Sequence, residues 1–161
     1  SKAVATKPYE WVIIPNLGRT SSGVQLQPSN IDALEISETS PRLEFDTYFF
    51  EQGNIKIQAY FSPTINYTSG DGMKYGISID DEKPQIINVH QDISESNWNK
   101  SVADNIKILT SNHAIPKPGK HVLKFYGLNS GLVLQKIVIE TANGKVKQTY
   151  LGPPESFKTK K

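Results

Sequence analysis

Apolar side chains recur at every second position in two consecutive runs of the chain, residues 42–51 and 55–61. In the first run, Leu43, Phe45 and Phe49 share one face, and mostly polar residues occupy the other. The shared apolar face of the second run comprises Ile55, Ile57, Ala59 and Phe61. A period of two is typical of strands that bury one face of an antiparallel sheet. We interpret the two runs as a hairpin closed by a tight turn at residues 52–54.

Further β-rich runs occupy much of the remaining chain, at residues 9–14, 24–26, 34–36, 73–80, 85–89 and 106–110. The short pieces 24–26 and 34–36 are typical of minor strands or connecting loops. The runs 122–126 and 132–139 carry large apolar residues on both faces, which predicts strands that are covered on most of both sides. Asn143-Gly144 is a strong signal for a type I′ hairpin turn, which predicts a further strand after it.

One segment, residues 92–105, favours a short helix, in which Trp98, Val102 and Asn105 would share a face. No long helical pattern and no regular alternation of strands with helices is evident in the sequence. About nine to eleven strands with regular turns between them predict an all-β fold. We expect an antiparallel β-sandwich, jelly-roll-like, with one short helix.

The 161 residues suit one domain with a single core. We expect a flexible lead-in at residues 1–8, a single β-sandwich domain at residues 9–156 and a disordered basic tail at residues 157–161. No apolar run reaches the roughly 20 residues that span a bilayer. The first residues also lack the apolar core of a signal peptide. These features predict no membrane insertion.

The net charge of +2 is misleading because it arises from the end of the chain. Three of the 18 basic residues, Lys158, Lys160 and Lys161, lie there, and the other 15 nearly balance the 16 acidic residues. A nearly neutral body without a basic stripe argues against nucleic acid as a partner. The absence of cysteine excludes disulfides, thiol catalysis and cysteine-bound zinc.

No catalytic constellation is evident in the sequence. The segment 127–131 contains Ser130 but lacks the spacing of a nucleophile elbow, and it is typical of a turn. His90, His113 and His121 are scattered and lack the spacing of metal ligands. We expect His121 to be a hydrogen-bonded residue within a strand. The sequence therefore predicts a chain that is not an enzyme by itself.

Three consecutive acids, Asp80, Asp81 and Glu82, follow one predicted strand. Calcium binds several oxygen ligands, so an acidic cluster is a candidate site. The spaced pattern of a calcium-binding EF-hand loop is missing, and a charged hairpin tip is the alternative interpretation. We expect no cofactor and leave a structural calcium ion open.

Segments along roughly residues 11–156 resemble one known family. The matching pieces are Ser62-Pro63-Thr64, Met73–Asp81, Trp98 with Val102 and Asn105, Pro118–Lys124, Leu132–Glu140 (LVLQKIVIE) and Tyr150–Ser156 (YLGPPES). Their combined order is similar to the C-terminal β-sandwich of family 115 glycoside hydrolases, the α-glucuronidases of xylan. The resemblance implies a sandwich of the carbohydrate-binding-module type. It also implies that the catalytic and substrate-binding acids belong to other domains.

Sugars bind proteins through an aromatic ring that covers the apolar face of the sugar and through polar groups that bind its hydroxyls. Predicted loops supply such groups at Asn66, Tyr67, Asn97, Trp98, Asn99 and Asn129. Trp98 has polar neighbours, as a sugar platform would, but its spacing from Val102 also fits an anchor that packs the short helix onto the sheet. Trp11 is either a sugar platform or a core residue, and its apolar run favours the core.

Two functions follow from the resemblance and these residues. The first is a non-catalytic carbohydrate-binding or accessory module of a bacterial hydrolase that degrades plant polysaccharide, with xylan or glucuronoxylan as the partner. The second is a structural docking or dimerisation domain of that hydrolase with no sugar binding of its own. Either function implies other domains or subunits of the parent hydrolase as partners. The resemblance also implies a secreted or periplasmic location.

Overall fold

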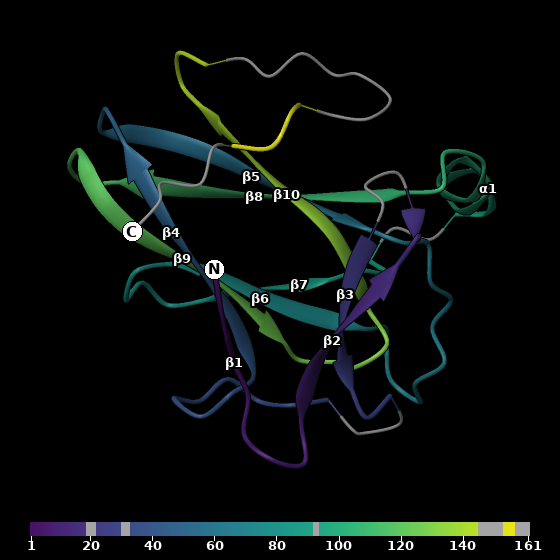
Figure 1. The fold of residues 1–161 in the computed structure, drawn as a ribbon. Coiled ribbons are helices and arrows are strands. Elements are labelled where there is room, and N and C mark those ends of the chain that lie inside the picture. Colours follow the sequence, from purple (N-terminus) through teal and green to yellow (C-terminus); the bar gives the residue numbers. More distant parts are fainter. Residues whose placement is uncertain (19–21, 30–32, 92–93, 145–152, 157–161) are drawn as a thin grey trace.

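Two five-stranded antiparallel sheets face each other in the computed structural model (Figure 1), which describes residues 1–18, 22–29, 33–91, 94–144 and 153–156. Sheet A comprises β1 (Lys2–Val4), β4 (Arg42–Phe49), β6 (Lys74–Ile79), β7 (Gln85–Asn88) and β9 (Gly119–Gly127), in the spatial order β1-β4-β9-β6-β7. Sheet B comprises β2 (Glu10–Pro15), β3 (Ser22–Gln27), β5 (Gly53–Phe61), β8 (Lys107–Ile115) and β10 (Val133–Thr141), in the order β2-β3-β10-β5-β8. The predicted all-β sandwich is confirmed.

The core lies between the two sheets and is built from the inward-facing residues of both. The rings of Phe61, Tyr75 and Phe125 meet there, with centroids 4.9 to 6.0 Å apart. Trp11 packs against this core, 6.2 Å from the Phe125 ring, and its indole N–H donates to Val4 O. The core interpretation of Trp11 is therefore confirmed. β9 and β10 occupy the centres of their sheets and are covered on most of both faces, as their sequences predict.

The connection between β4 and β5 corrects one prediction. The two strands lie in different sheets, so residues 50–52 cross the sandwich and do not close a hairpin. β4 pairs with β9, whereas β5 pairs with β8 and β10. Alternating apolar residues face the same core whether two strands share a sheet or lie in opposite sheets. The pattern alone therefore does not distinguish a hairpin from a crossing connection.

The predictions for two turns near strand ends have different outcomes. β6 and β7 form the predicted hairpin. The predicted type I′ turn at Asn143-Gly144 is wrong, because Thr141 pairs with Gly144 and the central turn residues, Ala142 and Asn143, have no positive φ. The strand predicted after this turn, the residues 150–152 and the tail 157–161 lie outside the described residues. Of the two short apolar pieces, 24–26 belongs to β3 and 34–36 belongs to a loop.

The first residues form a strand, where the sequence predicts a lead-in. β1 pairs with β4 at the edge of sheet A, with Lys2 opposite Glu44 and Val4 opposite Arg42. This pairing uses backbone groups of an edge strand, which require no apolar periodicity, so the pattern of side chains does not reveal it. The sandwich therefore begins before residue 9.

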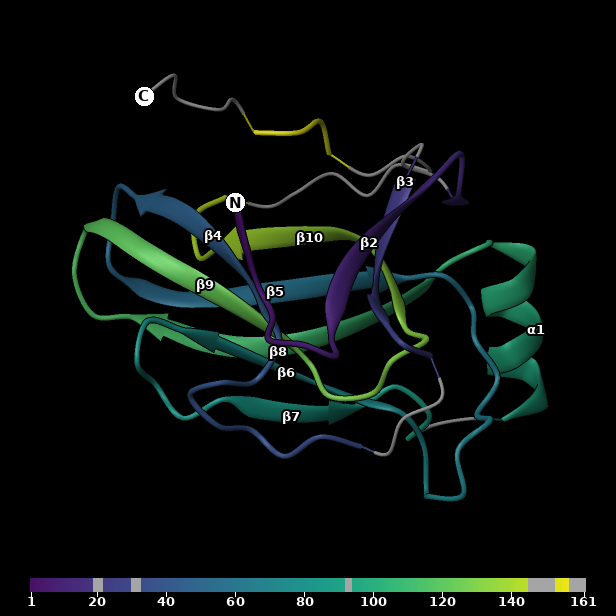
Figure 2. The same cartoon turned by 60° about the horizontal axis from the view of Figure 1, so that its bottom comes forward.

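The connections gather at two ends of the sandwich (Figure 2). The loop end comprises the described parts of the connections 28–41, 62–73, 89–106 and 128–132, and the third of these contains the short helix α1 (Glu95–Ala103). The far end comprises the turns 50–52, 80–84, 116–118 and 142–143. α1 confirms the predicted short helix. Within the described residues, no helix has the length and apolar character needed to cross a membrane.

Candidate functional site

The loop end brings together the segments that carry the predicted binding residues. Asn66 and Tyr67 lie in the connection 62–73, Asn97, Trp98 and Asn99 lie on α1, and Asn129 lies in the connection 128–132. Hydrogen bonds between loops link several of these segments, which are far apart in the sequence. Two features result, a cluster around Tyr67 and a groove beside α1.

Tyr67 combines a fixed hydroxyl with an accessible ring. Its Oη donates a hydrogen bond to Ser130 O and lies 3.0 Å from Ser29 O, so the residue joins three connections. Tyr67 nevertheless remains 50% exposed. Burial of the phenol raises its pKa, against the opposing effect of the hydrogen bond to Ser130. The hydroxyl therefore stays protonated at neutral pH and continues to donate.

Gly131 leaves room for this hydroxyl. Its φ is 91°, and a Cβ at this position would lie 1.8 Å from Tyr67 Oη. Another residue would have to adopt an unfavourable backbone conformation and displace the tyrosine. The neighbouring Ser130 Oγ is fully buried and has no hydrogen-bond partner among the described residues. Such a group is usually satisfied by water or a ligand.

The two asparagines near Tyr67 have largely structural roles. Asn66 closes its own loop, because its Oδ1 accepts from Thr68 N (3.0 Å) and its Nδ2 donates to Gly70 O (3.0 Å). Asn129 is buried, and its Oδ1 accepts from Lys74 N at 2.8 Å. Its Nδ2 has no hydrogen-bond partner among the described residues and is not fully enclosed. That amide nitrogen can therefore donate a further hydrogen bond.

His90 positions the connection 62–73, a role that the sequence did not reveal. Its Nδ1 accepts from Met73 N (3.0 Å), and its Nε2 donates to Thr64 O (2.8 Å), so the ring is a neutral imidazole with the proton on Nε2. Asn88 extends this contact, since its Oδ1 accepts from His90 N and its Nδ2 donates to Asp71 O. These bonds fix both ends of the segment that carries Tyr67.

A groove of about 480 Å³ lies between α1 and the strands β7 and β8. The helix lines it with polar side chains at spacings of three and four residues, which place them on one helix face: Asn97, Lys100, Ser101 and Asp104. The strands β7 and β8 and the end of the connection 89–106 contribute apolar residues, including Ile87, Ile106 and Leu109. Asn88 also lines the groove and bonds to the connection 62–73, so the groove and the Tyr67 cluster belong to adjoining parts of one surface. Figure 2 shows α1 beside the strands at this end.

The helix presents its apolar side chains elsewhere. Trp98 does not line the groove and is half-buried, and Val102, on the same helix face, is 51% exposed. α1 contains no fully buried residue, and of the predicted Trp98–Val102 anchor only Trp98 is partly covered, whereas Val102 does not pack onto the sheet. The helix face that lines the groove carries polar side chains, and the face with Trp98 and Val102 lies outside the groove lining. Asn99 is exposed and lies outside the groove lining.

The three acids of the turn at the far end, Asp80, Asp81 and Glu82, contact other side chains of the protein and do not converge on one point. Asp80 Oδ2 contacts His121 Nδ1 at 2.6 Å, Asp81 pairs with Lys124 Nζ at 3.0 Å, and Glu82 contacts His113. The acids thus turn to separate partners. Among the described residues, no group of three or more histidine, aspartate or glutamate side chains converges as a metal site would require.

His121 and Asp80 form a charged pair. The hydrogen bond that His121 Nδ1 donates to the Asp80 carboxylate raises the pKa of His121, and the Lys117 carbonyl, which accepts from His121 Nε2 at 2.9 Å, adds to the increase. Burial alone would raise the pKa of Asp80, but the hydrogen bonds from Val122 N and His121 outweigh burial and lower it. The prediction that His121 is a hydrogen-bonded strand residue is therefore confirmed.

The sequence and the fold agree on the family. The sequence model of the glycosyl hydrolase family 115 C-terminal domain matches residues 1–155. The chain belongs to this family. A solved family 115 4-O-methyl-α-glucuronidase, described as specific for decorated arabinogalactans, superposes with a TM-score of 0.66 at 18% identity over 89% of this chain. The chain covers only 18% of that enzyme's length.

Other solved structures share the fold of this family 115 domain at lower similarity. A family 35 carbohydrate-binding module from Clostridium thermocellum has a TM-score of 0.51 and 15% identity, with 85% of this chain and 90% of that module covered. The C-terminal family 6 module of a marine laminarinase from Zobellia galactanivorans has a TM-score of 0.51 and 12% identity, with 86% and 97% covered. The chain has no significant match among curated protein sequences. These likenesses establish a sandwich of the carbohydrate-binding-module type.

Proposed function

We propose that this family 115 domain is a non-catalytic carbohydrate-binding module that binds plant polysaccharide at its loop end. The observation that carries the proposal is Tyr67, whose ring is half exposed while its hydroxyl is fixed to the Ser130 carbonyl. An aromatic ring in a fixed position can stack on the apolar face of a sugar without first losing conformational freedom. Tyr67 is therefore the proposed platform.

Polar groups around the platform suit the hydroxyls of a sugar. Asn129 Nδ2 supplies a donor, and the face of α1 in the groove supplies Asn97, Lys100 and Ser101. The apolar floor of the groove suits the C–H faces of further sugar units. Trp98 remains a second candidate platform on α1. A chain of several sugars would then extend from the Tyr67 cluster along the groove.

The proposed ligand is glucuronoxylan or a related plant polysaccharide. The solved family 115 enzyme is described as acting with specificity for decorated arabinogalactans, which makes these the first competing ligands to compare. The proposed partner is the remainder of a glycoside hydrolase, which the module would tether to its substrate. A bacterial enzyme acting on such polymers would be secreted or periplasmic, and we propose this location for the parent protein.

A glycan screen on the domain tests the proposal. Affinity electrophoresis in gels with glucuronoxylan, arabinoxylan or arabinogalactan should retard the wild-type domain, and calorimetry with oligosaccharides should give a dissociation constant. Tyr67→Ala should weaken binding at least about tenfold, equivalent to about 1.4 kcal/mol. Tyr67→Phe keeps the ring and should retain more of the affinity, and Trp98→Ala tests the second platform. Lack of binding to every plant polysaccharide would sink the proposal.

One observation favours the alternative of a docking domain. β2 is an edge strand of sheet B, and its Ile13 is 70% exposed. An exposed edge strand with apolar side chains is prone to pair with another protein surface. This alternative predicts association with other hydrolase domains or with a second copy, and no sugar affinity. Analytical ultracentrifugation of wild type and Ile13→Lys, beside the glycan screen, separates the two functions.

A further inference from the structure

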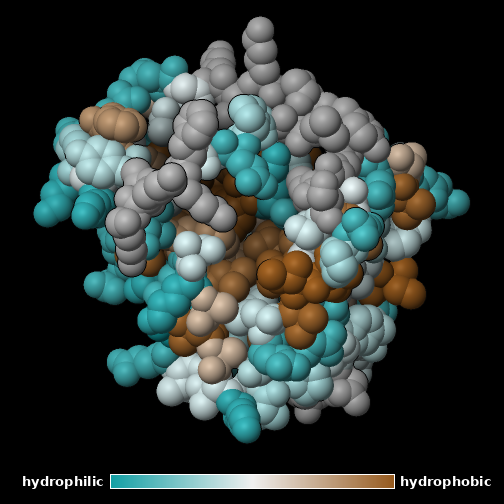
Figure 3. Space-filling view, viewed as in Figure 1, coloured by the Kyte–Doolittle hydropathy of each residue, from teal (hydrophilic) through white to brown (hydrophobic). Residues whose placement is uncertain are grey.

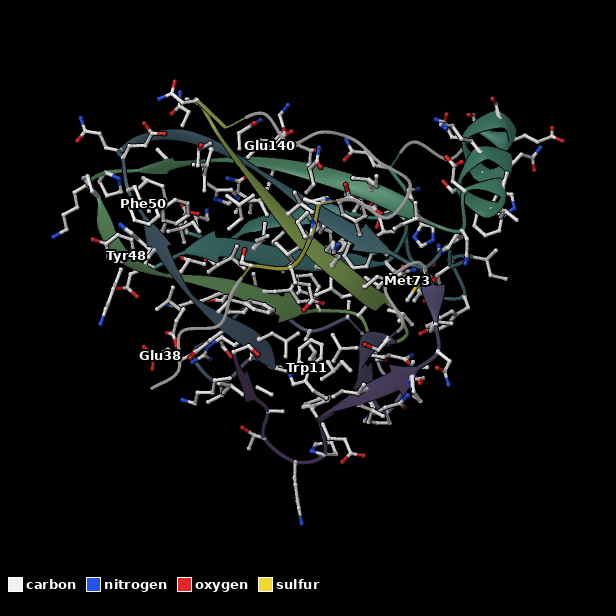
Figure 4. All side chains as sticks on the ribbon, turned by 45° about the horizontal axis from the view of Figure 1, so that its top comes forward. Trp11, Glu38, Tyr48, Phe50, Met73 and Glu140 are labelled. Carbon is white, nitrogen blue, oxygen red and sulfur yellow. The ribbon has the colours of Figure 1, made fainter. Side chains whose placement is uncertain are left out.

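Two exposed aromatic rings lie at the far end, remote from the proposed sugar site. Tyr48 is 58% exposed and Phe50 is 88% exposed, and their ring centroids are 5.1 Å apart at an interplanar angle of 60°. In Figure 4 both side chains lie on the side of the molecule opposite Met73, which ends the loop-end connection 62–73. Exposure of a phenylalanine to this degree sacrifices the free energy that burial would contribute. The pair therefore calls for an explanation other than folding.

The backbone that carries the pair is well fixed. Phe49, which lies between Tyr48 and Phe50 in the sequence, is buried. Its ring and the His121 ring meet edge to face at a centroid distance of 5.6 Å. His121 is bound in turn by Asp80 and the Lys117 carbonyl. Successive side chains of a strand point to opposite faces, so the burial of Phe49 directs Tyr48 outward. The Tyr48–Phe50 pair resembles Tyr67 in one respect, because a fixed backbone presents an accessible ring at both places.

Polar and charged residues neighbour the pair along the chain and across the pairing of β4 with β9. Asp46 precedes Tyr48 on the same strand face, and Lys120 lies opposite Tyr48 in the pairing of β4 with β9. Next to Phe50, the Glu51 carboxylate is fixed by Asn143 Nδ2 at 2.7 Å. Figure 3 shows a mostly hydrophilic surface at this end, on the left of the view. A protein interface would favour a broader apolar patch, whereas two rings with fixed polar neighbours suit a sugar.

We infer that Tyr48 and Phe50 form a second carbohydrate-binding site, which stacks a pyranose ring on the aromatic pair and binds its hydroxyls through Glu51, Asn143 and Lys120. The inference takes its ligand class from the proposed function and rests on it in that respect. β9 runs from one end of the sandwich to the other, and its nine residues span about 26 Å, with a rise of about 3.3 Å from each residue to the next. The two sites are thus separate, and the domain would bind two sugar segments at once.

Nuclear magnetic resonance titration of the ¹⁵N-labelled domain with xylohexaose and with galacto-oligosaccharides tests this inference. Amide shifts should change in two sets, one at residues 64–73 and 128–131 and one at residues 46–52, 119–121 and 143. The double variant Tyr48→Ala/Phe50→Ala should lose only the second set of shifts. The number of binding sites per domain, measured by calorimetry, should fall from two to one. Because both side chains are exposed, the variant should keep the wild-type fold.

The controls separate the aromatic pair from general surface effects. Ile13→Ala removes a similarly exposed apolar side chain and should keep both sets of shifts. The exchange Tyr48→Phe/Phe50→Tyr keeps two rings and should keep the second set. Affinity for polymeric glucuronoxylan should fall at least about tenfold in the double alanine variant, because attachment at two sites is lost.

Each result decides between the two proposals. Shifts confined to the loop end, with calorimetry unchanged by the double variant, overturn the second site and leave the proposed function intact. Shifts confined to the far end support the second site and overturn Tyr67 as the platform. Self-association that the double variant abolishes, without sugar-dependent shifts at the far end, identifies a protein interface and overturns the inference. Absence of shifts with every oligosaccharide overturns both.

Discussion

The two ends of the sandwich both expose aromatic rings but position them in different ways. At the loop end, Tyr67 extends from a long connection and is fixed by a neutral hydrogen bond to the Ser130 carbonyl of another connection, with the Ser29 carbonyl nearby. At the far end, Tyr48 and Phe50 extend from the end of β4, next to turns that are linked by pairs such as His121 with Asp80. The loop-end platform depends on contacts between loops, whereas the far-end pair depends on a strand and nearby charge. Changes in single loop residues should therefore disturb the first site much more than the second.

Gly131→Ala should have the largest effect, and it should disturb the site at the loop end without disturbing the far end. Its φ of 91° and the close Tyr67 Oη make any Cβ unfavourable. We expect a loss of about 1–3 kcal/mol in the free energy of unfolding from the backbone conformation. Sugar affinity at the loop end should fall at least about tenfold, or about 1.4 kcal/mol, because Tyr67 is displaced. Urea denaturation and calorimetry measure the two effects.

Gly53→Ala is the matched control at the far end. Its φ of 139° is equally unsuited to a side chain, but a Cβ there meets no atom within 4 Å. The variant should lose stability without losing affinity at the loop end. Equal losses of sugar affinity in both glycine variants would contradict the role assigned to Tyr67.

His90→Ala should give the next largest effect. Its removal leaves the buried Met73 N–H without its partner, at a cost of about 1–3 kcal/mol, whereas the part-buried Thr64 carbonyl can bind water instead. Sugar affinity should fall with stability, since these bonds fix the connection 62–73. His113→Ala, which removes a buried histidine at the far end, should lower stability alone. A loop-end affinity that is unchanged by His90→Ala would show that the connection keeps its conformation without the histidine.

The pH dependence of stability near neutral pH should arise from the His121–Asp80 pair at the far end. The pKa of His121 is raised above its ordinary value of 6.5, so the protonated pair with Asp80 contributes stability fully below about pH 6.5. This contribution should be lost as the pH rises through the raised pKa. The lowered pKa of Asp80 gives a second contribution, present above its ordinary value of 3.8 and lost as the pH falls through the lowered value.

Asp80→Asn should reduce both dependences. Urea denaturation at pH 6, 7, 8 and 9 should show a smaller decline in the free energy of unfolding for the variant than for wild type. Identical slopes for the two proteins would mean that the His121–Asp80 pair does not link protonation to folding.

The smallest effect should distinguish two neighbouring asparagines of α1. Asn97 lines the groove, whereas Asn99 lies outside it. Asn97→Ala should weaken oligosaccharide binding by about 0.5–1.5 kcal/mol, the usual net contribution of one hydrogen bond. Asn99→Ala should leave affinity unchanged in the same calorimetric titration. The reverse order would place the ligand on the outer face of α1.

The sequence predicts the strands well because side-chain alternation records which face is buried. Ile57 and Phe125 lie in the core as their patterns predict. It does not predict which sheet each strand joins, since β4 and β5 face the same core from opposite sheets. Strand partners depend on pairings between distant residues, and a period of two contains no information about them.

The candidate site was predictable only in part. Tyr67 and Asn129 could be selected as polar or aromatic groups on loops. Their mutual placement arises from contacts such as Tyr67 with Ser130, which are 63 residues apart in sequence and follow no periodicity. Trp98 and Val102 show the opposite case, because a helical spacing predicts a buried face and the structure leaves Val102 exposed. The position of a helix relative to a sheet depends on its connections as well as on its own pattern.

The most direct test of the central claim observes the Tyr67 ring itself. Aromatic ¹³C–¹H spectra of the labelled domain, recorded during titration with a glucuronoxylan oligosaccharide, report the environment of that ring. The account predicts that the Tyr67 ring signals shift and saturate with the same dissociation constant as calorimetry. Saturable sugar binding with unchanged Tyr67 ring signals would contradict it.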